Sequence, residues 1–167
     1  MRASQPALAA IKLAWWRERL EELDDGLVPA EPRLAAVARE LLPKGIAGAE
    51  LAQIEAGWAA LLHETPDTDA ALFRGEMLFA LASRLLQPAA SSAVTGAGRL
   101  YAGASLVRRA LLKTAPIETA TGARIPVRFR PLTALAALGI RDLRGKEPEG
   151  TPMRALALVR HRLSGRL

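Results

Sequence analysis

Residues 11–25 read IKLAWWRERLEELDD, and this stretch decides the fold class. Its apolar side chains recur every three or four residues, which is the spacing of one face of an α-helix. They are Leu13, Trp16, Leu20 and Leu23, and Leu8, Ile11 and Trp15 widen the same face. Gly26 follows, and glycine is common at a helix end. We therefore expect a first helix over residues 6–25 that buries one broad face.

The same spacing predicts six more helices. Their expected ranges are 32–42, 51–62, 66–87, 100–115, 131–142 and 152–163. Thr65 is the expected cap of the helix that starts at Pro66, because threonine suits the cap position and proline the first turn. That helix is apolar around most of its circumference, so we expect it at the centre of the fold.

Residues 124–130 alternate apolar and polar side chains and predict an extended strap, in which Pro126 argues against a central strand. The other connections are short, which favours an all-α, antiparallel helical bundle of about seven helices. A chain of 167 residues with 50% hydrophobic content suits a single domain over residues 1–167.

Composition also narrows the compartment and the kinds of site. The chain has no cysteine, which excludes disulfides and thiolate metal sites. No secretory signal is visible, and the apolar segment 132–140 is too short to span a bilayer. We expect a soluble, cytoplasmic protein, with peripheral association with a membrane as a further option.

Charge is divided unevenly along the chain. Residues 1–98 hold 9 Lys and Arg against 13 Asp and Glu, whereas residues 99–167 hold 14 against 4. Such a basic half favours an anionic partner: a diphosphate, an acidic membrane surface, an acidic protein face or nucleic acid. Nucleic acid is the weakest of these, because this half offers only Tyr101 and Phe129 for stacking. The alternative is that the arginines only keep an apolar protein soluble.

The strongest polar group of residues in the sequence is basic. Arg109 and Lys113 are i, i+4 neighbours on the expected fifth helix, and such a like-charge pair is unfavourable unless an anion lies between the two side chains. We predict an anion or diphosphate site here, and its candidate residues are Arg108, Arg109, Lys113, Arg124 and Arg128. A solvated face with diverging charges is the alternative.

Acidic and histidine patterns give little support to catalysis. Magnesium-dependent prenyl chemistry uses paired carboxylates, often as Asp-x-x-x-Asp, and that motif is absent. A weak alternative metal site is Glu18, Glu22 and Asp25. His63 and His161 are the two histidines and lack the spacing of a zinc motif. We assign no catalytic residues, and expect no cofactor unless magnesium binds those acids.

Several segments, in order, resemble the squalene/phytoene synthase family, nearest the branch allied to mitochondrial complex I assembly factors. The Trp-Trp-Arg-Glu helix of residues 11–21 is the clearest match. Similar segments follow at residues 73–82, 97–104, 106–111 and 122–126. The resemblance implies an isoprenoid-synthase-like bundle. In it, Gly75, Ala80, Ala82, Gly103 and Ala104 would leave room for a prenyl chain.

The departures from that family are as informative as the matches. Family members carry one Asp-rich motif before the Trp-Trp-Arg helix, and this chain begins close to that helix, so we expect that part of the site to be missing. Where the second Asp motif is expected, residues 108–113 read RRALLK. The resemblance therefore implies a protein without the magnesium platform that activates a diphosphate.

The leading hypothesis is a non-catalytic protein that acts by binding, as partner of a homologous synthase-like subunit, as an assembly factor or as an isoprenoid-handling factor. One alternative is an active magnesium-dependent prenyl-diphosphate transferase, with carboxylates from Glu18, Glu22 and Asp25 or from a second subunit. Another is a peripheral adaptor whose basic half docks on anionic membrane or acidic protein.

Overall fold

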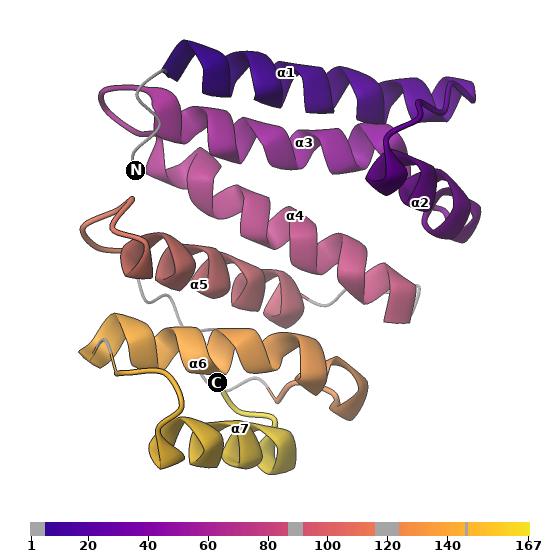
Figure 1. Ribbon diagram of the computed structural model, residues 1–167. Coiled ribbons are helices and arrows are strands. Elements are labelled where there is room, and N and C mark those ends of the chain that lie inside the picture. The colour runs from indigo at the N-terminus through magenta and orange to yellow at the C-terminus, as the bar shows by residue number, and fades with distance from the viewer. Residues whose placement is uncertain (1–5, 87–91, 116–123, 146) are drawn as a thin grey trace. The chain divides into compact units, whose positions relative to one another are not determined.

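The computed structural model describes residues 6–86, 92–115, 124–145 and 147–167. Within these ranges the regular structure consists of seven α-helices and four short 3-10 helices, without a strand (Figure 1). The prediction of an all-α fold with seven helices is confirmed.

The chain divides into two compact units, residues 1–74 and residues 75–167. The first unit contains α1 (Pro6–Glu22), η1 (Leu23–Asp25), α2 (Pro32–Glu40), η2 (Leu42–Lys44), α3 (Gly48–Ala59), η3 (Ala60–Leu62) and the start of α4 (Thr68–Leu86). The second contains the rest of α4, α5 (Ser92–Arg108), η4 (Val127–Phe129), α6 (Arg130–Gly145) and α7 (Pro152–Ser164). The expectation of a single domain stays a prediction.

In the first unit, α1 and α3 lie side by side and run antiparallel (Figure 1). The Asp24 carboxylate just after α1 accepts hydrogen bonds from the backbone N–H groups of Gly48 and Ala49, at 2.6 and 2.8 Å. It thereby caps the start of α3. The first helix ends as predicted, because Gly26 takes the left-handed conformation with φ of 79°.

Helix α4 departs from its prediction in two ways. It begins at Thr68, not at Pro66, because the Asp67 carboxylate accepts a hydrogen bond from the Ala70 N–H at 3.1 Å and takes the cap that we assigned to Thr65. It is also not enclosed on all sides. Phe79 is fully buried, whereas the equally apolar Leu78 is 43% exposed.

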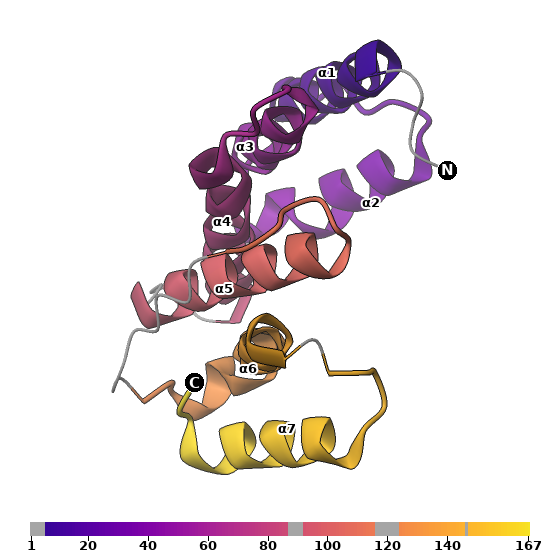
Figure 2. The ribbon, with the colours of Figure 1, turned by 90° about the vertical axis from the view of Figure 1, so that its left-hand side faces the viewer.

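The second unit has a core drawn from three helices and the turn before α6. Its buried members are Phe79, Ala93, Val94, Ala97, Leu100, Ile125, Phe129, Ala136 and Ile140. Helices α5 and α6 run parallel in this unit: Gly139 packs on Ala104, and Asp142 reaches Arg108 one turn further along both helices. The antiparallel prediction therefore holds for α1 with α3 and for α6 with α7, but not for α5 with α6 (Figure 2).

The expected strap over residues 124–130 is correct only for its first half. Residues 124–126 lack regular structure, and Ile125 donates its N–H to the Gly165 carbonyl at 2.8 Å. From Val127 the chain turns into η4, and α6 begins at Arg130. Pro131 explains this early start, because its fixed φ favours the first turn of a helix.

Small residues in the second unit serve close helix packing. A Cβ atom at Gly98 would overlap the backbone carbonyl of Gly75, and a Cβ at Gly75 would overlap that of Gly98. A Cβ at Gly139 would lie 2.9 Å from that of Ala104. The resemblance assigned Gly75 and Ala104 to a space for a prenyl chain. Here they let α4, α5 and α6 approach one another instead.

We expect Gly98→Ala to lower the free energy of unfolding by about 1–3 kcal/mol, because the added methyl group overpacks the crossing of α4 and α5. Gly96→Ala is the matched control. No atom lies within 4 Å of a Cβ placed there, so it should stabilise the same helix by about 0.5–1 kcal/mol. Urea unfolding followed by helical circular dichroism distinguishes the two, and equal effects would refute the close crossing.

Candidate functional site

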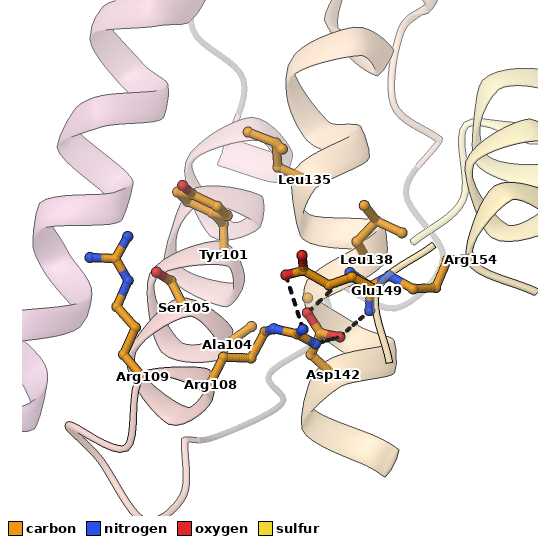
Figure 3. Close-up of a pocket in the computed structure, with 11 residues that line it drawn as sticks. Tyr101, Ala104, Ser105, Arg108, Arg109, Leu135, Leu138, Asp142, Glu149 and Arg154 are labelled. Carbon is orange, nitrogen blue, oxygen red and sulfur yellow. Dashed lines mark hydrogen bonds and ion pairs between the residues drawn. The ribbon is translucent and has the colours of Figure 1, made fainter. Parts of the chain in front are cut away.

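A polar cavity of about 440 Å³ lies in the second unit (Figure 3). Side chains from α5, α6, α7 and the loop between α6 and α7 line it. They belong to Tyr101, Ala104, Ser105, Arg108, Arg109, Leu135, Leu138, Gly139, Asp142, Glu149 and Arg154. The lining combines an aliphatic floor with three guanidinium groups and two carboxylates, so the cavity suits a polar ligand better than an apolar one.

Asp142 is the centre of the charged wall of this cavity. Its side chain is buried, with 7% exposed, and Arg108 donates to its Oδ1 at 2.8 Å. Arg154 at the start of α7 binds the same carboxylate, and this hydrogen bond raises the pKa of Arg154 above its ordinary value. One carboxylate thus holds the ends of α5 and α6 to the start of α7 (Figure 3).

The loop between α6 and α7 adds its two glutamates to this network. Arg108 donates to the Glu147 carbonyl oxygen at 3.2 Å and to the Glu149 carboxylate at 3.0 Å. Arg141 donates to the Glu147 carboxylate at 2.6 Å, and this bond lowers the pKa of Glu147. The contact of Glu147 with Arg141 therefore adds fully to the free energy of unfolding at pH values above the ordinary carboxyl pKa. This contribution is lost as the pH falls through the lowered pKa of Glu147 in the folded protein.

These contacts change the interpretation of the basic candidates. Arg108 is committed to carboxylates and a carbonyl group, whereas Arg109 also lines the cavity but contacts no carboxylate among the described residues. Lys113 and Arg124 are exposed and lie outside the cavity lining. Arg128 lies 5.4 Å from the centre of the Phe129 ring. The structure thus brings two of the five candidates together at this cavity.

The helical pairing of Arg109 with Lys113 is wrong, because α5 ends at Arg108. Ala110 then adopts a left-handed conformation with φ of 57°. Its N–H bonds to the Val107 carbonyl at 3.1 Å, and the Leu111 N–H bonds to the Leu106 carbonyl at 2.9 Å. This pair of bonds is a Schellman motif, which normally has glycine where this chain has Ala110.

We expect Ala110→Gly to raise the free energy of unfolding by about 1 kcal/mol, because it relieves the strain of a left-handed alanine. Ala155→Gly, at an exposed position within α7, is the matched control and should lower stability by about 0.5–1 kcal/mol. Thermal unfolding of both variants checks the prediction, and a loss of stability in both would show that α5 does not end at this turn.

The acidic candidates do not form a metal site in this structure. Arg19 binds Glu22 at 2.6 Å and lies 4.0 Å from Glu18. Asp25 follows them on η1, and the described residues contain no group of three His, Asp or Glu side chains that could hold a metal ion. A hard cation such as Mg²⁺ needs several converging oxygen ligands, so Glu18, Glu22 and Asp25 do not fit it as arranged.

The first unit holds a second cavity, an apolar pocket of about 370 Å³ between α1, α2 and α3. Its lining is Leu13, Trp16, Leu20, Arg33, Leu34, Val37, Leu51, Ile54, Glu55 and Trp58. Eight of these ten side chains are uncharged and apolar. The pocket includes Trp16 of the Trp-Trp-Arg stretch, so the segment that suggested a family also contributes to the most apolar site described.

The lining of the apolar pocket includes two charged groups, Arg33, which is exposed, and Glu55, which is largely buried with 11% of its side chain exposed. Arg33 has 82% of its side chain exposed and lies 6.0 Å from the ring centre of Trp16. Glu55 lies 3.7 Å from Arg17, an ion pair that joins α1 to α3. Arg74 stacks over Trp58, at 3.9 Å from its ring centre. The pocket therefore combines aliphatic and indole walls with a cation at the rim.

Sequence reasoning missed this pocket and the role of Asp142. The helical stripes identify Leu13, Trp16 and Trp58 as inward-facing, but they do not reveal that the space between the helices stays unfilled. One feature of the sequence could have pointed to Asp142: it is one of only four acidic residues among residues 99–167, where cations are in excess. Its partners Arg108 and Arg154 are distant in sequence, so local spacing could not pair them.

Comparisons with models of protein families, with curated proteins and with solved structures found no match to this chain. The resemblance to the squalene/phytoene synthases therefore stays a prediction that rests on the motifs themselves.

We expect Asp142→Ala to lower the free energy of unfolding by about 2–3 kcal/mol, because it leaves Arg154 without its carboxylate partner and Arg108 with only the exposed Glu149. Glu149→Gln removes a partner of Arg108 that is 80% exposed, and should cost about 0.5 kcal/mol or less. Urea unfolding measures both. A small effect of Asp142→Ala would show that this carboxylate does not hold the three helices together.

Proposed function

We propose that this chain is a non-catalytic, squalene/phytoene synthase-like protein that acts by binding, and that its ligand is an isoprenoid held in the apolar pocket of the first unit. The observation that carries the proposal is the lining of that pocket, in which eight of ten side chains are apolar. An isoprenoid chain has no hydrogen-bonding groups, so it suits these eight side chains, and the largely buried Glu55 carboxylate of the lining already has Arg17 as a partner at 3.7 Å.

The size and composition of the pocket support a small ligand. Its volume of about 370 Å³ lies within the range of about 300–1,000 Å³ that is usual for small-molecule sites. Trp16 and Trp58 provide broad flat walls, and aliphatic side chains from three helices complete the surface. Arg33 at the rim would lie near the polar end of a ligand, where a guanidinium group favours an oxyanion or a hydroxyl group.

The arrangement of the acidic residues favours binding over turnover. Ionisation of a prenyl diphosphate needs Mg²⁺ held by several carboxylates, and Glu22, the central acidic candidate, is paired with Arg19 at 2.6 Å. The alternative, an active transferase, would need carboxylates from a second subunit or a rearrangement of this helix. A role as partner of a complete synthase-like subunit is compatible with ligand binding in this pocket.

Intrinsic tryptophan fluorescence tests the binding, because Trp16 and Trp58 line the pocket. We expect farnesol or geranylgeraniol to change the emission in a saturable way. Val37→Phe fills the pocket and should weaken binding about ten-fold or more, as expected when steric fit in an apolar site is lost. Ile11→Phe, at a position that is 66% exposed, is the matched control and should bind like the parent.

A turnover assay separates binding from catalysis. Incubation of the purified chain with farnesyl or geranylgeranyl diphosphate and Mg²⁺ should give no condensed product. Robust product that is lost in Glu22→Ala would contradict the proposal and support the transferase. Unchanged fluorescence with both alcohols, or equal binding by Val37→Phe and the parent, would contradict the ligand.

A further inference from the structure

Helix α7 exposes a row of large apolar side chains. Met153, Leu156, Val159 and Leu163 are 51%, 57%, 53% and 76% exposed. Their spacing of three, three and four residues places them along one side of the helix. We call these four residues the α7 row. Exposed apolar residues are common singly, but a continuous row along one helix is a feature that needs a partner surface.

The opposite side of α7 is fixed against α6. His161 is 2% exposed, and its Nε2 lies 2.9 Å from the Thr133 hydroxyl oxygen on α6. Arg154 of α7 binds Asp142, which is also on α6. At about 100° per residue these two inward-facing side chains lie on the other side of α7 from Leu156. The α7 row therefore points away from α6. In the ribbon, α7 follows α6 as the last helix of the second unit (Figure 1).

Unpaired cations flank the α7 row. Arg160 and Arg162 are exposed, lie beside Val159 and Leu163, and contact no carboxylate among the described residues. Helix α7 itself has no acidic residue. The three acidic residues described beyond residue 99 are Asp142, Glu147 and Glu149, and arginines of the cavity network already bind all three. The surface beside Val159 and Leu163 is therefore cationic, because the described carboxylates near α7 lie at its other end and are already paired with arginines.

We propose that α7 docks on the surface of an anionic lipid bilayer. The four apolar side chains would enter the boundary between headgroups and acyl chains, and Arg160 and Arg162 would stay at the level of the lipid phosphates. In this arrangement α7 lies along the membrane surface and does not cross the bilayer. This agrees with the finding that no helix in the described part of the chain is long and apolar enough to cross a bilayer.

The charge pattern favours a bilayer over other occupants. A second copy packed through the same row would bring Arg160 and Arg162 of both chains together, which is electrostatically unfavourable. Nucleic acid supplies phosphates but no apolar surface for the α7 row, and α7 has no aromatic side chain for stacking. An anionic bilayer supplies both partners, because its phosphates lie at the surface, where the arginines would be, and its apolar layer lies beneath them, where the four apolar side chains would be. The proposal does not depend on the isoprenoid pocket of the first unit.

Vesicle co-sedimentation of the full chain tests this docking. We expect binding to phosphatidylcholine vesicles that contain about 30% phosphatidylserine, little binding without it, and a steep loss between about 0.1 M and 1 M salt. Arg160→Gln/Arg162→Gln should weaken binding about thirty-fold. Leu156→Ser/Val159→Ser should weaken it about ten-fold or more.

Matched controls remove the same groups from the first unit. Arg39→Gln/Lys44→Gln takes away two exposed cations, and we expect a change within about two-fold. Ile11→Ser removes a side chain that is 66% exposed and should bind like the parent. All the altered positions are exposed, and circular dichroism verifies that each variant keeps its helices.

The absence of native cysteine allows a site-specific probe of insertion. Leu163→Cys labelled with the environment-sensitive dye NBD should brighten and shift to the blue on anionic vesicles, and Ile11→Cys with the same label should not. An apolar signal at position 163 before vesicles are added would show that the protein itself covers the row and would overturn the proposal.

Two further results would also overturn it. One is the absence of binding to anionic vesicles at about 0.1 M salt. The other is a Leu156→Ser/Val159→Ser variant that binds as tightly as the parent, which would mean that charge alone holds the protein. If that variant also bound heparin as the parent does, the basic surface would belong to a soluble polyanion.

Discussion

The second unit depends on one buried carboxylate that two arginines share. Asp142 can lie away from water because Arg108 and Arg154 approach it from two other helices. Arg108 also bonds to Glu147 and Glu149, so its guanidinium group is already engaged by the protein. These bonds hold the loop between α6 and α7 beside the polar cavity. Arg109 remains the cation at that cavity without a carboxylate partner among the described residues. Of the basic candidates in the sequence, Arg108 therefore has a structural role.

How much the sequence could predict depended on whether the deciding interaction was local. The end of the first helix was predictable, because Gly26 signals the left-handed turn that follows. The end of α5 was not, because Ala110 adopts the same kind of turn without the residue that usually marks it. The start of α4 was misplaced by two residues, because Asp67 outcompetes Thr65 as a cap.

The candidate sites were harder to predict than the helices. Helical periodicity correctly identifies Trp16 and Trp58 as inward-facing, but it also placed Ile11 and Trp15 on the buried face of the first helix, and they are 66% and 41% exposed. It gives no information on whether neighbouring helices fill the space between inward-facing side chains, and here a pocket remains. The charged residues were likewise predictable in number but not in pairing. The excess of cations in the second half was evident from composition, but the pairing of Arg108 with Asp142 spans 34 residues and requires the fold.

The hairpin of α6 and α7 is closed at both ends. Asp142 and Arg154 join the helices at one end, and at the other Arg130 donates to the carbonyl groups of Arg162 and Leu163 at 2.8 and 3.0 Å. Because α7 is joined to α6 at both ends, a tilt of α7 also moves α6. A contact on the outer face of α7 can therefore displace Asp142 and the side of the polar cavity that it lines. If a ligand at the polar cavity shifts α7, it changes the affinity of the outer face of α7 for its own partner, and reciprocity requires the same factor in the other direction.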